Sequence, residues 1–245
     1  MSSLSDSDDV EYNGSETLDP FQKVNVVEEN TRREPISIEL TYPLGADPTT
    51  GNITVRLQTD PSPGCGGIAW PAGEVLAKYL AGKGPDNLNG KAIVELGSGT
   101  GLVGLVAALL GARVYITDQL PLLPAMEKNT DLNGLQNRVN VVEYNWGGDI
   151  PDGLPDRIDY VLAADCVYFE PAFPLLVKTL CDLNGRGQPE FFFCYKKRRK
   201  ADKRFFAQLK KYFTWQQVGD DPDFQVYSRD SISLFRLVFK GKGGV

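Results

Sequence analysis

Apolar positions along this chain recur at two periods: every second residue, as in strands, and every third or fourth, as in helices. Segments of the strand type are 36–42, 53–58, 92–96, 113–117, 138–143, 158–163, 190–195, 224–227 and 232–239. Segments of the helix type are 70–80, 102–110, 120–132 and 173–180, with one more helix marked by Phe205, Leu209 and Phe213. The alternation of strand and helix from residue 91 onward predicts an α/β fold with a parallel sheet.

Two pairs of segments predict antiparallel pairing. The alternating segments 36–42 and 53–58 flank a turn region that contains Gly51-Asn52, so they predict an N-terminal β-hairpin. At the other end of the chain, 224–227 and 232–239 suggest an antiparallel hairpin that closes the sheet.

The first 35 residues differ in composition from the rest. They lack sustained periodic apolar positions and are rich in Ser, Asp, Glu and Asn, which is typical of disorder. Ten acids and three bases give residues 1–40 a charge of −7, whereas the whole chain carries −6. The folded body is therefore near neutral, and the overall acidity says little about the substrate. The predicted parts are an acidic disordered tail at 1–35, a β-hairpin at 36–60 and a main α/β domain at 61–245.

The composition excludes several kinds of chemistry. The chain has no histidine, so a Ser-His-Asp triad, a Cys-His protease and a His-ligated zinc site are impossible. Four widely spaced cysteines without a C-x-x-C pair favour reduced thiols in a cytosolic or nuclear protein. No apolar stretch could span a bilayer, and the acidic N-terminus is unlike a signal peptide. We expect a cytoplasmic protein with no membrane partner and no metal site.

The most informative segment follows the first strand of the main domain, where Glu95 precedes Gly97, Gly99 and Gly101. Glycines let the backbone adopt positive φ and approach a ligand at the carboxyl edge of the sheet. The spacing G-x-G-x-G differs from the dinucleotide fingerprint G-x-G-x-x-G. A carboxylate there would repel a pyrophosphate but suits the ammonium and sulfonium of S-adenosylmethionine. The alternative is a turn whose glycines serve close packing only.

Asp118 ends the next strand, where a carboxylate can accept hydrogen bonds from both ribose hydroxyls. Each signal alone is weak. The order strand, Glu, G-x-G-x-G, helix, strand, Asp is specific enough to predict S-adenosylmethionine as the cofactor.

Several segments together resemble the family-16 lysine methyltransferases, which include enzymes acting on chaperones and on elongation factor 1-alpha. They are Gly66–Trp70, Glu95–Gly104, Ile116–Asp118, Trp146-Gly147 and Ala163–Glu170. Because Tyr195–Lys203 also fits, the fungal elongation-factor methyltransferases are the most similar subgroup. The resemblance extends from about Cys65 to the C-terminus. It implies a seven-stranded Rossmann-like methyltransferase sandwich that methylates a lysine side chain, with elongation factor 1-alpha as the expected acceptor protein.

The glycine motif and the resemblance together imply a set of cofactor contacts. Trp146 is expected near the adenine, Ala164 leaves room for the cofactor, and Trp70 can wall the pocket. For both tryptophans, core packing is the alternative. The expected cofactor-binding residues are Trp70, Glu95, Gly97, Ser98, Gly99, Gly101, Asp118, Trp146 and Ala164.

The expected catalytic residues, Asp165 and Tyr168, follow the fourth strand of the main domain. Enzymes that methylate planar nitrogens carry Asn/Asp-Pro-Pro-Tyr at this place, whereas Cys166 and Val167 replace the prolines here. The departure suits an aliphatic amine. Asp165 can orient that amine, and Tyr168 can line its channel or donate to Asp165; the alternative for Asp165 is a cap of the following turn. Cys166 is expected to fill space, because no histidine could activate it.

The basic segment 196–200 follows the fifth strand, at the same edge of the sheet. It can dock an acidic or RNA-bound substrate protein, or it can be a solvated loop. No aromatic residues alternate with its charges, so direct nucleic-acid binding is not expected. We expect a monomer that acts on a protein. Two alternatives stay open: a methyltransferase of a small molecule or RNA, and a non-catalytic cofactor-binding scaffold.

Overall fold

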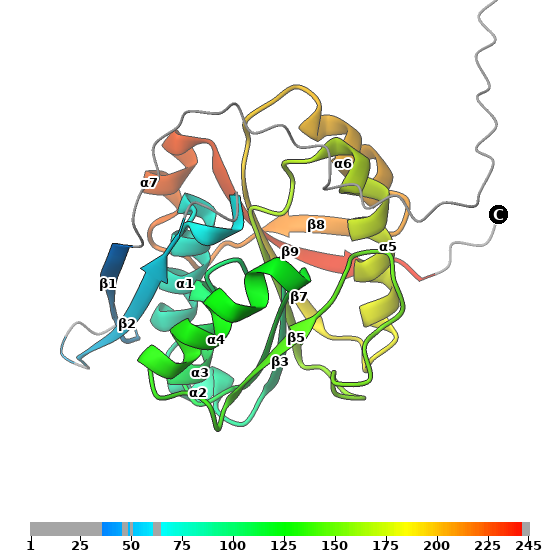
Figure 1. Cartoon of the computed structure of the whole chain (residues 1–245). Coiled ribbons are helices and arrows are strands. Elements are labelled where there is room, and N and C mark those ends of the chain that lie inside the picture. Colours follow the sequence, from blue (N-terminus) through cyan, green and yellow to red (C-terminus); the bar gives the residue numbers. More distant parts are fainter. Residues whose placement is uncertain (1–35, 46–48, 50, 61–64, 242–245) are drawn as a thin grey trace, which may run out of the picture.

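The computed structural model describes residues 36–45, 49, 51–60 and 65–241 (Figure 1). The predicted tail at 1–35 lies outside this part. The strands are β1 (Ile36–Pro43), β2 (Asn52–Thr59), β3 (Ala92–Leu96), β4 (Arg113–Asp118), β5 (Val139–Glu143), β6 (Tyr160–Ala164), β7 (Glu190–Lys196), β8 (Phe213–Gln217) and β9 (Ile232–Phe239). The α-helices are α1 (Pro71–Lys83), α2 (Pro85–Leu88), α3 (Leu102–Leu109), α4 (Leu123–Leu132), α5 (Phe173–Asn184), α6 (Asp202–Leu209) and α7 (Phe224–Tyr227). Within these ranges, every helix is too short or too polar to cross a membrane.

The main sheet has seven strands in the order β5-β4-β3-β6-β7-β9-β8. The first five are parallel, and β9 runs antiparallel to both β7 and β8. This arrangement confirms the predicted seven-stranded Rossmann-like fold. The chain leaves β3 for β4 on one side and reaches β6 on the other, which makes the carboxyl ends of these strands the expected ligand site.

Helices cover both faces of the sheet: α1, α3 and α4 lie on one face, and α5 and α6 lie on the other (Figure 1). All five residues of β3 are buried, as expected for a strand that is covered on both sides. Ile93 packs in the core beside α1 and α3, whereas Val94 and Leu96 pack in the core beside α5. By the same alternation, Glu95 faces α3.

The N-terminal hairpin is confirmed, since β1 and β2 pair antiparallel along their full length. Val55 and Leu57 of β2 are fully buried in the core beside α1 and α3. On the edge of β2, the amide of Asn129 accepts a 2.7 Å hydrogen bond from the backbone N–H of Gln58. The Asn129 amide also donates to the carbonyl of Thr100 at 2.9 Å. The hairpin is thereby joined to the glycine turn that follows β3.

Two predictions near the C-terminus are wrong. Phe213 does not continue the helix marked by Phe205 and Leu209: α6 ends at Leu209, and Phe213 begins β8. It pairs with Phe239 of β9, and their rings lie 5.2 Å apart. The segment 224–227 is helix α7 and not a strand. The closing antiparallel pair therefore exists, but β8 supplies its second strand.

Candidate active site

The loop after β3 has a backbone that requires glycine. Gly97, Gly99 and Gly101 have φ values of 60°, 55° and 80°, a region that L side chains rarely adopt. A Cβ on Gly99 would lie 2.6 Å from the carbonyl oxygen of Gly66, and one on Gly97 would lie 2.8 Å from the Trp146 ring. The glycines therefore permit both the turn and close contacts with two distant segments.

Asp118 lies at the end of β4 against this loop. Its Oδ2 accepts a hydrogen bond from the N–H of Gly99 and its Oδ1 accepts one from the N–H of Gln119, both at 2.8 Å. Burial raises the pKa of this carboxyl, and the two hydrogen bonds oppose the shift. An ionised carboxylate has about four acceptor positions, so two remain for further donors such as hydroxyls.

Glu95 is brought to the same loop, but its side chain lies behind it. The residue is 3% exposed, and its Oε2 accepts a 2.9 Å hydrogen bond from the N–H of Gly104 in the first turn of α3. Burial raises the pKa of Glu95 to about 8. Its visible role is to stabilise the start of α3, and its contact with the cofactor stays a prediction.

Ser98 has its side chain turned inward as well. Its hydroxyl accepts from the N–H of Thr117 at 3.0 Å and donates to the carbonyl of Glu95 at 3.2 Å. The Thr117 hydroxyl donates to the same carbonyl at 2.7 Å. These bonds fix the loop to β4, and a cofactor contact of Ser98 also stays a prediction.

Trp146 and Ala164 border the loop from the neighbouring segments. Trp146 is half-buried, and its ring lies against Gly97. Ala164 ends β6 and is also half-buried. The buried thiol of Cys166 donates to the carbonyl of Leu96 at 3.3 Å, and burial raises its pKa well above the usual range. The thiol therefore stays protonated, in agreement with a space-filling role.

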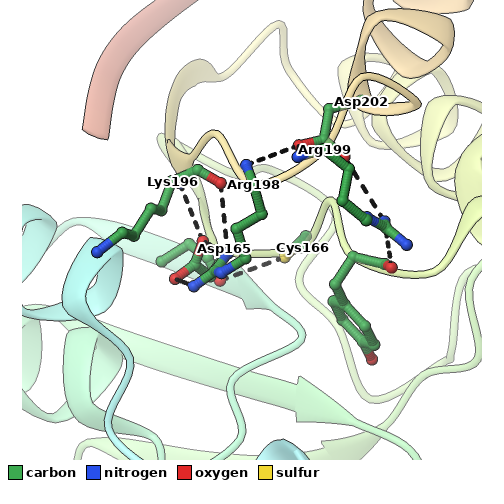
Figure 2. A network of polar contacts seen from close by, with 8 residues as sticks. Asp165, Cys166, Lys196, Arg198, Arg199 and Asp202 are labelled. Atoms are coloured by element: carbon green, nitrogen blue, oxygen red, sulfur yellow. Dashed lines mark hydrogen bonds and ion pairs between the residues drawn. The ribbon is translucent and has the colours of Figure 1, made fainter. Parts of the chain in front are cut away.

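Asp165 lies at the centre of a network of polar contacts at the carboxyl edge of the sheet (Figure 2). It has a positive φ of 55° and is 7% exposed. The Arg198 guanidinium donates to both carboxylate oxygens, with Nη1–Oδ1 at 2.7 Å and Nη2–Oδ2 at 2.9 Å. The backbone N–H of Lys196 donates to Oδ1 at 3.0 Å.

The sequence did not reveal Arg198 as the partner of Asp165. A signal was present, because Asp165 follows β6, the basic segment follows β7, and parallel neighbours end at the same edge of a sheet. What the sequence lacked was the direction of the arginine side chain.

Trp70 and Tyr168 contact the arginines of this network. The Trp70 ring lies 5.1 Å from the Arg198 guanidinium, a cation–π contact. Tyr168 is 39% exposed, and its carbonyl oxygen accepts a hydrogen bond from Arg199. Whether Trp70 also walls the cofactor pocket stays a prediction.

The basic segment contains two kinds of side chain: arginines that bind acidic residues of the protein, and lysines that, among the described residues, do not. Besides the contacts of Arg198, the buried carboxylate of Asp202 accepts from the N–H groups of Arg198 and Arg199 at 3.0 and 3.1 Å (Figure 2). The two arginines are thus tied to the protein body. Lys197 and Lys200 are exposed and form no ion pair within the described residues.

The raised pKa of Glu95 makes stability depend on pH. Its pKa is about 8 in the folded protein and about 4.3 in an unfolded chain, so the folded state binds the extra proton. The free energy of unfolding should therefore fall as pH rises from about 5 to 8, by up to about 1.4 kcal/mol per pH unit. Urea unfolding across this range should show a smaller fall for Glu95→Gln. Parallel curves for the two proteins would contradict the assignment.

Comparison with known proteins agrees with this geometry. Residues 50–212 match the model of the lysine methyltransferase family. Over 202 residues the chain is 43% identical to protein-lysine N-methyltransferase EFM6 of Saccharomyces cerevisiae, covering 72% of this chain and 82% of that protein. It is 39% identical to protein N-lysine methyltransferase METTL21A of Danio rerio, covering 74% and 85%. Against EEF1A lysine methyltransferase 3 of Xenopus tropicalis the identity is 35%, covering 64% and 70%.

A solved structure also shares the fold. The T. thermophilus 16S rRNA N2 G1207 methyltransferase, in complex with AdoMet and guanosine, superimposes with a TM-score of 0.50 at 16% identity. The match covers 82% of this chain and 50% of that chain. Identity this low shows a common fold and nothing finer. The family match is stronger evidence, because it spans most strands of the main sheet and agrees with relatives that are identical at over a third of the aligned residues. This chain belongs to the lysine methyltransferase family.

Proposed function

We propose that this chain transfers the methyl group of S-adenosylmethionine to a lysine side chain of translation elongation factor 1-alpha. One observation carries the proposal: the glycine loop and the Asp165 turn are in contact. A Cβ on Gly97 would lie 3.2 Å from the Sγ of Cys166, the residue after Asp165. The choice of acceptor rests on similarity to the Xenopus tropicalis relative, which is named an EEF1A lysine methyltransferase. We also propose that the chain acts as a monomer in the cytoplasm.

The residues of the loop fit this cofactor. Asp118 would accept hydrogen bonds from the ribose hydroxyls with its two remaining acceptor positions. Trp146 and Ala164, on either side of the loop, would border the adenosine. When bound, the cofactor supplies a methyl group on a sulfonium, which a neutral amine can attack.

On the acceptor side, Asp165 would orient the lysine amine, and Tyr168 would line the channel. A free lysine has a pKa of about 10.4, so its amine must lose a proton before it can react. A partly desolvated channel favours the neutral amine. Positioning of the amine in line with the methyl group would account for most of the rate gain.

Labelling separates this proposal from its alternatives. Purified protein and radioactive S-adenosylmethionine are added to an extract of cells that lack the enzyme. We expect one labelled protein band, identified as elongation factor 1-alpha, with the methyl groups on lysine by mass spectrometry. Labelled RNA or metabolites would favour a different methyltransferase. Cofactor binding without any labelled product would favour a non-catalytic scaffold.

The role of Asp118 is tested by Asp118→Ala. Each lost hydrogen bond to a charged group costs roughly 1.5–3 kcal/mol, so calorimetry should show at least about tenfold weaker cofactor binding. Asp159→Ala is the matched control. Asp159 also accepts a backbone hydrogen bond, from Ala92 at 2.9 Å, but at the opposite end of the sheet. Equal losses of affinity in both variants would show that the effect is structural.

The exposed lysines of the basic segment are proposed to dock the substrate. Reversal of Lys197 and Lys200 to Glu should raise KM for the protein substrate at low salt, with cofactor affinity unchanged. The effect should shrink as salt rises, because exposed charges are screened over about 10 Å at roughly 0.1 M. Reversal of Lys210 and Lys211, both exposed beyond the other end of α6, is the control. If both reversals change KM equally, the docking proposal is wrong.

A further inference from the structure

Among the ion pairs between described residues, the Asp165–Arg198 pair has the smallest combined exposure of its two side chains. Asp165 has a side chain only 5% exposed, and that of Arg198 is 30% exposed. In the surface pair of Glu39 and Arg56, both side chains are more than 60% exposed. Exposed pairs contribute little because water screens them, whereas the charges of a part-buried bidentate pair act strongly on each other and on their neighbours.

Arg198 is held in this position from several directions. Its guanidinium lies over Trp70 on one side and binds both Asp165 oxygens on the other. Its backbone N–H donates to Asp202 Oδ2 at 3.0 Å, which fixes the chain just before α6. The contact is therefore part of the fold of this edge of the sheet.

The pairing bears on the proton of the substrate lysine. A bare carboxylate within about 4–6 Å of an ammonium stabilises the charged form, by roughly one to three pKa units. Such a carboxylate would bind the lysine well but would also retain the proton that must leave. An arginine bound to that carboxylate cancels its charge and leaves its remaining lone pair as a hydrogen-bond acceptor.

We propose that Arg198 is a positioning residue for lysine methylation, which aims the Asp165 carboxylate and cancels its charge. Asp165 then orients the substrate amine without holding its proton. The proton leaves to water, the nitrogen lone pair forms the new N–C bond, and the electrons of the broken S–C bond stay on sulfur. This inference rests on the proposed function, since it requires a lysine acceptor.

Other titratable groups surround the pair, and they must be separated from its effect. They are Glu95, Asp118, Cys166, Tyr168, Cys194, Lys196, Arg199, Asp202 and Asp221. Burial keeps the thiols of Cys166 and Cys194 protonated by raising their pKa values. Glu95, with a pKa of about 8, titrates in the working range. All of these groups are the same in every variant below, so only differences between variants report on the pair.

The test compares two variants with opposite expected shifts. Arg198→Gln keeps one hydrogen-bond donor but leaves Asp165 uncompensated, so the pH of half-maximal kcat should rise by about one unit or more. Asp165→Asn leaves the arginine uncompensated, so the same midpoint should fall. Asparagine tolerates the positive φ at this position, which preserves the backbone. Arg198→Lys restores the charge and should bring the midpoint back, with kcat still reduced because the bidentate geometry is lost.

Binding gives a second readout that does not require turnover. Calorimetry with unmethylated elongation factor 1-alpha and no cofactor should show equal or tighter binding for Arg198→Gln at neutral pH, together with its lower kcat. Lys203→Met is the control, because it removes an exposed positive charge from α6 that makes no ion pair within the described residues. Its pH midpoint should match the wild type.

The outcomes distinguish the inference from the proposed function. If the wild type methylates no lysine, the proposed function fails. If it methylates lysine and the midpoints of Arg198→Gln and Asp165→Asn both coincide with the wild type, Arg198 is merely structural and the inference is overturned. If Arg198→Gln does not fold, Asp165→Asn alone tests the inference: its pH of half-maximal kcat should fall below that of the wild type, and an unchanged value overturns the inference.

Discussion

The carboxyl ends of β4, β3, β6 and β7 lie next to one another at one edge of the sheet, and this adjacency determines the contacts of the site. Each strand contributes one group in spatial order: Asp118, the glycine loop, Asp165 and then Arg198. Neighbouring parallel strands are about 4.8 Å apart, so each group is within reach of the next. Asp118 therefore binds the loop, the turn after Asp165 contacts the loop from the other side, and Arg198 reaches Asp165.

Much of the fold could be predicted because the parallel strands are buried on both faces and read as short apolar runs. The errors fall where aromatic residues fit two periods at once. Phe213 stands four residues after Leu209, as in a helix, yet it also begins an alternating segment. Phe213 is in a strand because it pairs with Phe239 of β9, a residue far away in the sequence, so the local pattern around Phe213 could not reveal this contact. Phe224 and Tyr227 are three residues apart and pack on each other in a helical turn, with rings 5.8 Å apart.

For the site, the sequence indicated which residues gather but not where each side chain points. The glycines and Asp118 follow from spacing, because backbone conformation and strand ends fix them. Glu95 is predicted to contact the cofactor, and that contact stays a prediction. The structure adds that its side chain lies against α3, a direction that the two-residue period shared with Ile93 already indicates. Ser98 is similar, since its hydroxyl completes backbone hydrogen bonds of β3 and β4. The direction in which a side chain points depends on packing with residues far away in the sequence, and the local segment does not show these contacts.

The basic segment shows how the chemistry of the two cationic side chains divides their roles. A guanidinium is planar and can donate two parallel hydrogen bonds to a carboxylate, whereas an ammonium is a compact and strongly hydrated charge. Accordingly, the Arg198 guanidinium binds Asp165, whereas Lys197 and Lys200 form no ion pair within the described residues. The net charge of this segment therefore overstates the positive charge that is available to bind a partner protein. Part of it is already used to neutralise an acid of the site, and only the lysines are left to act on charges outside the molecule.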